Sequence, residues 1–355
     1  MTQRENMLRT ICFEHPEYIP VNFVVNDSVY FRYNPDEIAE LLESHPIIAG
    51  KHTIRHDLFE RRRQVEERKR EAAQRNEILP NHRFLDEFGV EWEEAIDGIR
   101  GVVQNHPLAD FSKIGDYRLP ALPQFHPEEE RERVARAKAD GYFTATGLPH
   151  GHLFLRLTDL CGYENVLLGM ADDDENLKLL IRRIEEHSIA YVEHWSKIGY
   201  DMIGFPEDLG MQIGPMISPA LFRDYIKPSY KRLMKPARDS GAIIHMLSDG
   251  DIRALKDDLV DGGVDLLNLQ DLVNGLDWIR DRFAGKNCVD LDIDRQKITV
   301  FGTPAEVDAL IREEVEKLSS PAGGLMLTFG WYAGTPIENI RALMDALEKY
   351  MFRWS

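Results

Sequence analysis

Short apolar runs alternate with longer amphipathic segments along most of this chain, and this alternation constrains the fold more than any other feature. The runs lack the strict polar alternation of half-exposed strands, as expected for strands buried on both faces. Capping pairs such as Ser218-Pro219 mark helix starts between them. The pattern predicts parallel βαβ units in a (β/α)8 TIM-type barrel, which we expect to form one domain over residues 1–355. The seven runs are 19–25, 142–146, 202–205, 242–246, 266–269, 288–293 and 325–328.

One part of the chain, residues 46–135, interrupts this alternation. It contains a charged segment with helical character at 58–76 and a region rich in β-forming residues at 84–103. We expect an insertion, including a hairpin, that lies over one mouth of the barrel and shapes the pocket. The basic residues of the helix alternate with glutamates, which predicts a solvated face rather than a nucleic-acid site.

The composition limits the partners of the chain. Its net charge is −18, which disfavours binding to phosphate backbones and to anionic membrane surfaces. It has no run of about 18 apolar residues, and its first residues lack the apolar segment of a secretion signal. The three cysteines, Cys12, Cys161 and Cys288, are too far apart for a metal-binding pair. We expect a cytoplasmic protein that binds neither nucleic acid nor membranes, with a homodimer left open.

Polar residues lie where the predicted strands end. In a TIM-type barrel the carboxyl ends of the strands carry the active site. Glu207 and Asp208 follow one run well before the next helix start, so capping does not explain them. His245 lies inside the next run, and histidine is a common general base and metal ligand. We predict that these three residues are catalytic. The predicted substrate-binding residues are Asn26, Asp249, Asn268, Asp290, Asp292, Phe329 and Trp331.

Each candidate also has a structural interpretation. Asp249 precedes a helix, where a carboxylate often serves as the cap. A buried histidine usually satisfies its hydrogen bonds locally; the alternative for His245 is a His–carboxylate metal site with Glu207 on the neighbouring strand, with zinc as the ion. Phe329 and Trp331 would either stack on a flat ligand or pack beneath the insertion.

Several segments, in this order and spacing, resemble the uroporphyrinogen decarboxylase superfamily over nearly the whole chain. That superfamily includes the decarboxylase itself and methyltransferases that exchange methyl groups with corrinoid proteins. The resemblance implies a (β/α)8 barrel with its pocket at the carboxyl ends of the strands. The segments are RENMLR at 4–9, YIPVN at 18–22, ISPALFRD at 217–224, GAIIH at 241–245, SDG at 248–250, GGVD at 262–265, FGTP at 301–304 and TPIEN at 335–339.

Departures from the family pattern favour the methyltransferase branch. The decarboxylase has an arginine-rich loop after its first strand, whereas the loop at 26–32 holds one arginine and an added acid. It also has a histidine in its last strand loop, where this chain has Phe329 or a close neighbour. Thiol-activating methyltransferases carry His-x-Cys, but here Leu247 follows His245 and Met246, and no cysteine lies near the last strand.

The resemblance therefore implies transfer of a methyl group between a corrinoid protein and either a small methylated compound, such as a methoxylated aromatic, or tetrahydrofolate. The cobalamin would sit mainly on the partner, because the chain lacks an Asp-x-His-x-x-Gly motif. Glu207, Asp208 and His245 would supply a proton or hold a zinc ion. The alternative is decarboxylation of a small or tetrapyrrole-like carboxylate in the same pocket. A third reading is a barrel that binds a folate or tetrapyrrole without catalysis.

Overall fold

Each of the seven predicted apolar runs overlaps a parallel strand of one sheet. The computed structural model describes residues 1–50, 53–75, 77, 81–94, 97–99 and 101–354. The strands of the main sheet are β1 (Val21–Val25), β5 (Ala145–Gly147), β6 (Met202–Gly204), β7 (Glu207–Asp208), β10 (Ile243–Asp249), β11 (Leu266–Gln270), β12 (Cys288–Asp292) and β13 (Leu325–Trp331).

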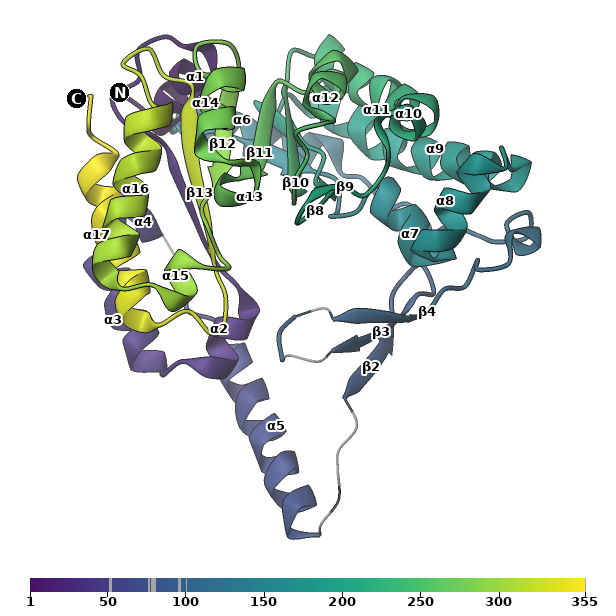
Figure 1. Ribbon diagram of the computed structural model, residues 1–355, viewed down its shortest axis with the longest axis horizontal. Helices are drawn as coiled ribbons and strands as arrows, with labels where there is room; N and C mark the ends of the chain where they lie inside the picture. Colours follow the sequence, from purple (N-terminus) through teal and green to yellow (C-terminus); the bar gives the residue numbers. More distant parts are fainter. Residues whose placement is uncertain (51–52, 76, 78–80, 95–96, 100, 355) are drawn as a thin grey trace.

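The strands of the sheet lie in the order β1-β13-β12-β11-β10-β6-β5. The short strand β7 follows β6 in the sequence and pairs with the same neighbour, β10. Neighbouring strands are parallel and closely in register, so that Asn268 lies opposite both Leu247 and Asp290. The sheet curls, and helices cover its outer face (Figure 1). This arrangement confirms the predicted TIM-type class. Within the described residues no ladder joins β1 to β5, so these two strands form the edges of the curled sheet.

The helices fill the connections between strands. Amphipathic patterns and clear caps explain their limits, such as the capping box of Thr303 and Glu306 at the start of α16. The helices are α1 (Gln3–Cys12), α2 (Asp27–Arg32), α3 (Pro35–Ser44), α4 (Pro46–Ala49), α5 (His56–Gln74), α6 (Pro127–Ala139), α7 (Phe154–Cys161), α8 (Tyr163–Ala171), α9 (Glu175–Ile198), α10 (Pro219–Leu221), α11 (Lys227–Asp239), α12 (Lys256–Gly262), α13 (Asp271–Asn274), α14 (Leu276–Phe283), α15 (Ile298–Phe301), α16 (Pro304–Leu318) and α17 (Ile337–Tyr350), with a short 3-10 turn at Phe111–Lys113 and a π turn at Phe222–Ile226.

The predicted insertion contains a long helix and a small antiparallel sheet. Helix α5 covers most of the charged segment, and residue 76, the last of the predicted helix, lies outside the described residues. The predicted hairpin region holds β2 (His82–Leu85), β3 (Glu91–Glu94) and β4 (Val102–Asn105), with 95–96 and 100 outside the described residues. The Nη2 atom of Arg61 lies 3.4 Å from Oε2 of Glu94, and this ion pair links α5 to β3.

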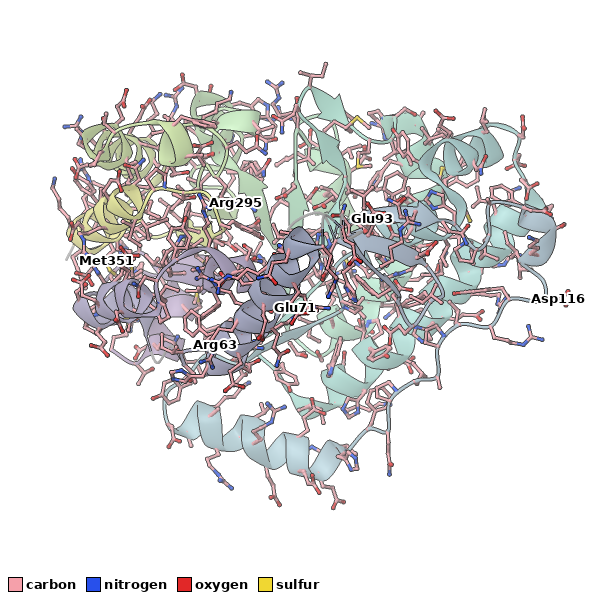
Figure 2. All side chains as sticks on the ribbon, turned by 90° about the horizontal axis from the view of Figure 1, so that it is seen from below. Arg63, Glu71, Glu93, Asp116, Arg295 and Met351 are labelled. Atoms are coloured by element: carbon pink, nitrogen blue, oxygen red, sulfur yellow. The ribbon has the colours of Figure 1, made fainter. Side chains whose placement is uncertain are left out.

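The insertion extends from the barrel on the side where the strands end (Figure 1). Seen from below, the view passes over Arg63 and Glu71 of α5 and Glu93 of β3, and it also labels Arg295 at the strand ends (Figure 2). Over this mouth also lies a two-stranded hairpin of β8 (Gly210–Met211) and β9 (Gly214–Pro215). Among the described helices, none is both long and apolar enough to span a membrane.

Candidate active site at the strand carboxyl ends

The inward-facing residues of the sheet form layers that change from apolar to polar along the strands. Outward-facing residues such as Ile244, Leu267 and Leu291 belong to the main core beneath the helices. Side chains alternate between the two faces of a strand, so the residues between them point inward. The first inward layer is an apolar cluster of Ile243, Leu266, Cys288, Met326 and Met202 with α1 residues. The next inward residues along β10 to β13 are His245, Asn268, Asp290 and Thr328, which we call the polar layer.

Within the polar layer, His245 and Asp290 form a dyad. The Nε2 atom of His245 lies 3.1 Å from Oδ2 of Asp290, and Thr328 Oγ1 donates to Oδ1 of Asp290 at 2.7 Å. Asp290 is 5% exposed, and the side chain of His245 is 17% exposed. An ionised Asp290 accepts from Nε2–H, which leaves Nδ1 as the ring nitrogen that can exchange a proton with a ligand. Asp290 therefore fixes the orientation of the His245 ring.

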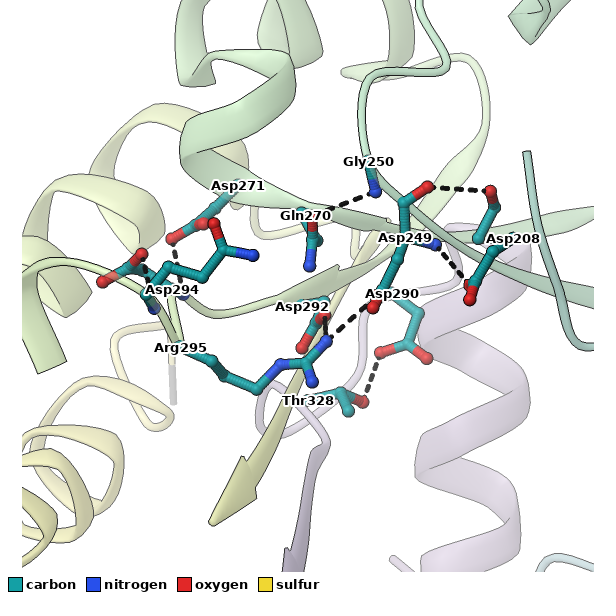
Figure 3. Close-up of polar contacts among 12 residues, drawn as sticks. Asp208, Asp249, Gly250, Gln270, Asp271, Asp290, Asp292, Asp294, Arg295 and Thr328 are labelled. Atoms are coloured by element: carbon teal, nitrogen blue, oxygen red, sulfur yellow. Dashed lines mark hydrogen bonds and ion pairs between the residues drawn. The ribbon is translucent and has the colours of Figure 1, made fainter. Parts of the chain in front are cut away.

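Above the polar layer, Arg295 lies between two carboxylates. Its Nη2 is 3.0 Å from Asp249 Oδ1 and 2.5 Å from Asp292 Oδ2 (Figure 3), and its guanidinium lies over the Tyr332 ring at 5.3 Å. Burial raises the pKa of Asp292 to about 7, although Arg295 opposes this shift. Burial also raises the pKa of Asp249, and the neighbouring Asp208 adds to the effect. Arg295 thus pairs with two carboxyl groups, and the one on Asp292 has a pKa near neutral pH.

Asp208 joins this cluster from β7. Its Oδ1 accepts the backbone N–H of Asp249 at 3.1 Å, and Nε2 of His150 lies 3.3 Å from the same oxygen. The hydrogen bond to Asp208 raises the pKa of His150. Burial opposes ionisation of Asp208, but the contacts with His150 and with the Asp249 peptide outweigh it and lower the pKa of this carboxyl.

The turn after β10 depends on close contact between two glycines. Gly250 has a φ of +80°, and a Cβ atom there would lie 2.2 Å from the carbonyl carbon of Gly210. A side chain at either position would push the β8–β9 hairpin away from Asp249. The Ser248-Asp249-Gly250 segment of the sequence therefore has a geometric role in shaping the mouth.

Glu207 has a different environment from its neighbour Asp208. It is fully buried and accepts the peptide N–H groups of Leu153, Phe154 and Leu155 at 2.8–3.1 Å, at the start of α7. The hydroxyl of Tyr230 donates to it at 3.0 Å. Negative charge at a helix amino terminus is stabilising, so these contacts make Glu207 a structural anchor.

The structure therefore corrects the predicted pairing of His245 with Glu207. The contact that His245 makes is with Asp290, while the Glu207 oxygens are occupied by four donors. Across the described residues, no group of three or more His, Cys, Asp or Glu side chains is arranged to hold a metal ion. These residues do not fit a zinc ion held by His245 and Glu207, and we derive no step through one.

Three other residues, which the sequence predicted to bind substrate, instead pack in the core or cap a helix. Phe329 and Trp331 are fully buried in the core between sheet and helices, where both contact Phe23. They share the outward face of β13 with Leu327, so they do not form the predicted stacking wall. Asn26 caps α2, because its side chain accepts the N–H of Ser28 at 2.9 Å.

The remaining predictions converge on one place. Asp208, Asp249 and Asp292 end β7, β10 and β12, and Asp290 lies in the middle of β12; their roles in binding or catalysis stay predictions. The sequence reasoning missed Arg295 and Thr328. Thr328 has the same parity as Met326 on β13, so a search for polar residues by strand parity would have found it. Arg295 lies in the loop after β12, where strand parity gives no direction.

A parallel barrel with acid–base groups at the carboxyl ends of its strands defines an enzyme-type scaffold. The family model described as uroporphyrinogen decarboxylase (URO-D) matches residues 89–350, which is more than half of the chain. The protein belongs to this family.

A solved methyltransferase structure shares this fold. A methyltransferase from Methanosarcina mazei matches with a TM-score of 0.64 and 16% identity over 99% of both chains. A complex of a GH113 β-1,4-mannanase is more distant, with a TM-score of 0.43 and 11% identity over 96% of this chain and 100% of that one. A search of curated proteins finds no match.

Proposed function

We propose that this protein transfers a methyl group from a small, neutral methylated compound to a corrinoid carried by a partner protein. The observation that carries the proposal is the excess of acids in the barrel mouth. Asp249 and Asp292 share one arginine, Arg295, while Asp208 lies beside His150 and Asp290 beside His245. A polycarboxylate, as in tetrapyrrole decarboxylation, would be repelled here, whereas a neutral ligand would not.

The shared fold supports this class of reaction. The structure from Methanosarcina mazei is described as a methyltransferase, so such a barrel is compatible with methyl transfer. The family name also keeps decarboxylation as the competing function. The two reactions make opposite demands on the site, because a decarboxylase must bind an anionic carboxylate and the methyltransferase must assist departure of an oxygen.

The His245–Asp290 dyad supplies the proton that the departing oxygen needs. When the methyl–oxygen bond breaks, the electron pair stays on the oxygen, and protonated His245 donates its Nδ1 proton there. Neutral His245 retains the proton on Nε2, which donates a hydrogen bond to Asp290, and Thr328 donates to the other oxygen of Asp290. Arg295 and its two acids lie above, where they fix the polar groups of the ligand and exclude further anions.

The corrinoid supplies a cobalt(I) nucleophile that accepts the methyl group when it is bound. The inner face of the sheet is open to solvent at its edge strand β1. Val24 pairs with Gly330, which places it on the inward face of β1, and it is 48% exposed. Tetrahydrofolate is the second acceptor that we propose to test.

The proposal is tested by incubating the purified protein with reduced cobalamin and a panel of methyl ethers, and by following formation of methylcobalamin. We expect the His245→Gln and Asp290→Asn variants to lose roughly 100- to 10,000-fold in rate. His82→Gln, a change at an exposed histidine on β2, serves as the matched control and should keep full activity. Release of carbon dioxide from carboxylate substrates, with no methyl transfer, would favour the decarboxylase instead.

A further inference from the structure

Asn268 is a buried amide without a partner. It is 1% exposed, and neither its Oδ1 nor its Nδ2 has a hydrogen-bond partner. It points inward from β11, between the strand of His245 and the strand of Asp290, with Asp290 directly opposite in register. It therefore belongs to the polar layer that contains the acid–base dyad.

Two other buried asparagines, Asn274 and Asn6, have both amide atoms paired within the fold, and Asn339 has its Nδ2 paired. Asn274 donates to the carbonyl groups of Gly250 and Gln270 and accepts the N–H of Ile252. Asn6, which is equally buried, donates to Tyr18 and accepts two peptide N–H groups. A buried amide with neither atom paired is costly to the folded state, because it has lost its water without compensation.

The neighbours of Asn268 do not relieve this cost. Each oxygen of Asp290 already has a partner, in Thr328 and His245. On the other side, Asn268 is in register with Leu247, whose side chain has no polar atom. The missing partner must therefore come from outside the polypeptide.

We propose that the Asn268 amide binds the substrate, through a group that both donates and accepts a hydrogen bond, such as a hydroxyl. An amide offers one donor and one acceptor side by side, which a hydroxyl can meet together. A carboxylate would lack the donor and would face the Asp290 carboxylate, and a quaternary ammonium would offer no hydrogen bond at all. This inference rests on the proposed function and narrows its substrate class to hydroxylated methyl ethers.

The first test is the thermal stability of the protein without any ligand. Asn268→Leu removes two unpaired polar atoms at similar volume, so we expect its Tm to equal or exceed that of the wild type. Asn274→Leu is the matched control, because it breaks three hydrogen bonds. Its Tm should fall by about 4 °C or more. A comparable fall for Asn268→Leu would show that the fold itself satisfies this amide, and would overturn the proposal.

The second test compares two probes of similar shape, 2-methoxyphenol and 1,2-dimethoxybenzene, by titration calorimetry. Only the first carries a hydroxyl donor. The wild type should bind it roughly tenfold more tightly, and Asn268→Leu should abolish the difference. Equal affinities in the wild type, a preference that persists in Asn268→Leu, or no binding of either probe would each refute the assignment.

Failure of this inference is distinguishable from failure of the proposed function. Donor-dependent binding without methyl transfer to cobalamin would keep the Asn268 assignment and refute the proposed reaction. Methyl transfer from both probes at equal efficiency would keep the reaction and refute the role of Asn268. Agreement of both measurements would identify the substrate class.

Discussion

The substitution Glu207→Gln separates a catalytic role for this residue from a structural one. Glu207 is fully buried and accepts three peptide N–H groups and the hydroxyl of Tyr230. Glutamine has the same shape, but one of its two terminal atoms is an NH2 donor that cannot accept. At least one donor then loses its partner, which costs about 1–3 kcal/mol. The remaining bonds lose their charge assistance, so the total loss of stability is about 3–5 kcal/mol.

The assay is equilibrium unfolding in urea, with methyl transfer measured on the folded protein at low temperature. We expect a lower midpoint with an unchanged m-value, and a rate per folded molecule within about threefold of the wild type. Glu306→Gln is the control, because Glu306 also caps a helix but is exposed to solvent. Its loss of stability should be clearly smaller. Unchanged stability of Glu207→Gln together with abolished transfer would refute the anchoring role and restore Glu207 to the mechanism.

Three further predictions follow from the buried groups around the site. Burial raises the pKa of Asp271 to about 6, and burial together with Asp271 raises that of Glu314 well above its usual value. These two carboxyl groups therefore stabilise the folded state fully below a pH of about 4, and this stabilisation is lost as the pH rises through 6. In Glu314→Gln the free energy of unfolding, measured by urea titration, should fall less steeply over this pH range. Arg295→Gln should leave ionised Asp292 unpaired, so stability should fall by about 3 kcal/mol at pH 8, above the Asp292 pKa of about 7, and by much less at pH 5. Trp331→Phe should lower stability by about 1–2 kcal/mol through lost packing while the KM for the methyl donor stays constant; a large rise in KM would return Trp331 to the ligand site.

The strands and helices were predictable because their signals are local. A run of apolar residues is buried wherever the chain goes, and a Thr-Pro or Ser-Pro pair caps a helix by contacts within a single turn. All seven runs overlap strands of the main sheet, with ends that differ by a few residues. The charged helix and the β-rich region of the insertion were found for the same reason.

The site was predictable only in part, because it depends on which face of a strand each residue takes. The parity of β12 puts Asp290 and Asp292 inside, and that of β13 puts Phe329 and Trp331 outside. Glu207 lies beyond a break between β6 and β7, where the period of two starts again and sequence spacing no longer gives direction.

By itself, the sequence determined the class of fold, the places where strands end and the acidic character of those ends. Tertiary structure alone decided which groups meet. It paired His245 of β10 with Asp290 of β12 across the intervening strand β11, set Arg295 between two acids, and turned Glu207 toward the start of α7. The physical reason is that secondary structure arises from neighbours along the chain, whereas a site arises from strand order, register and facing, which local residues do not encode.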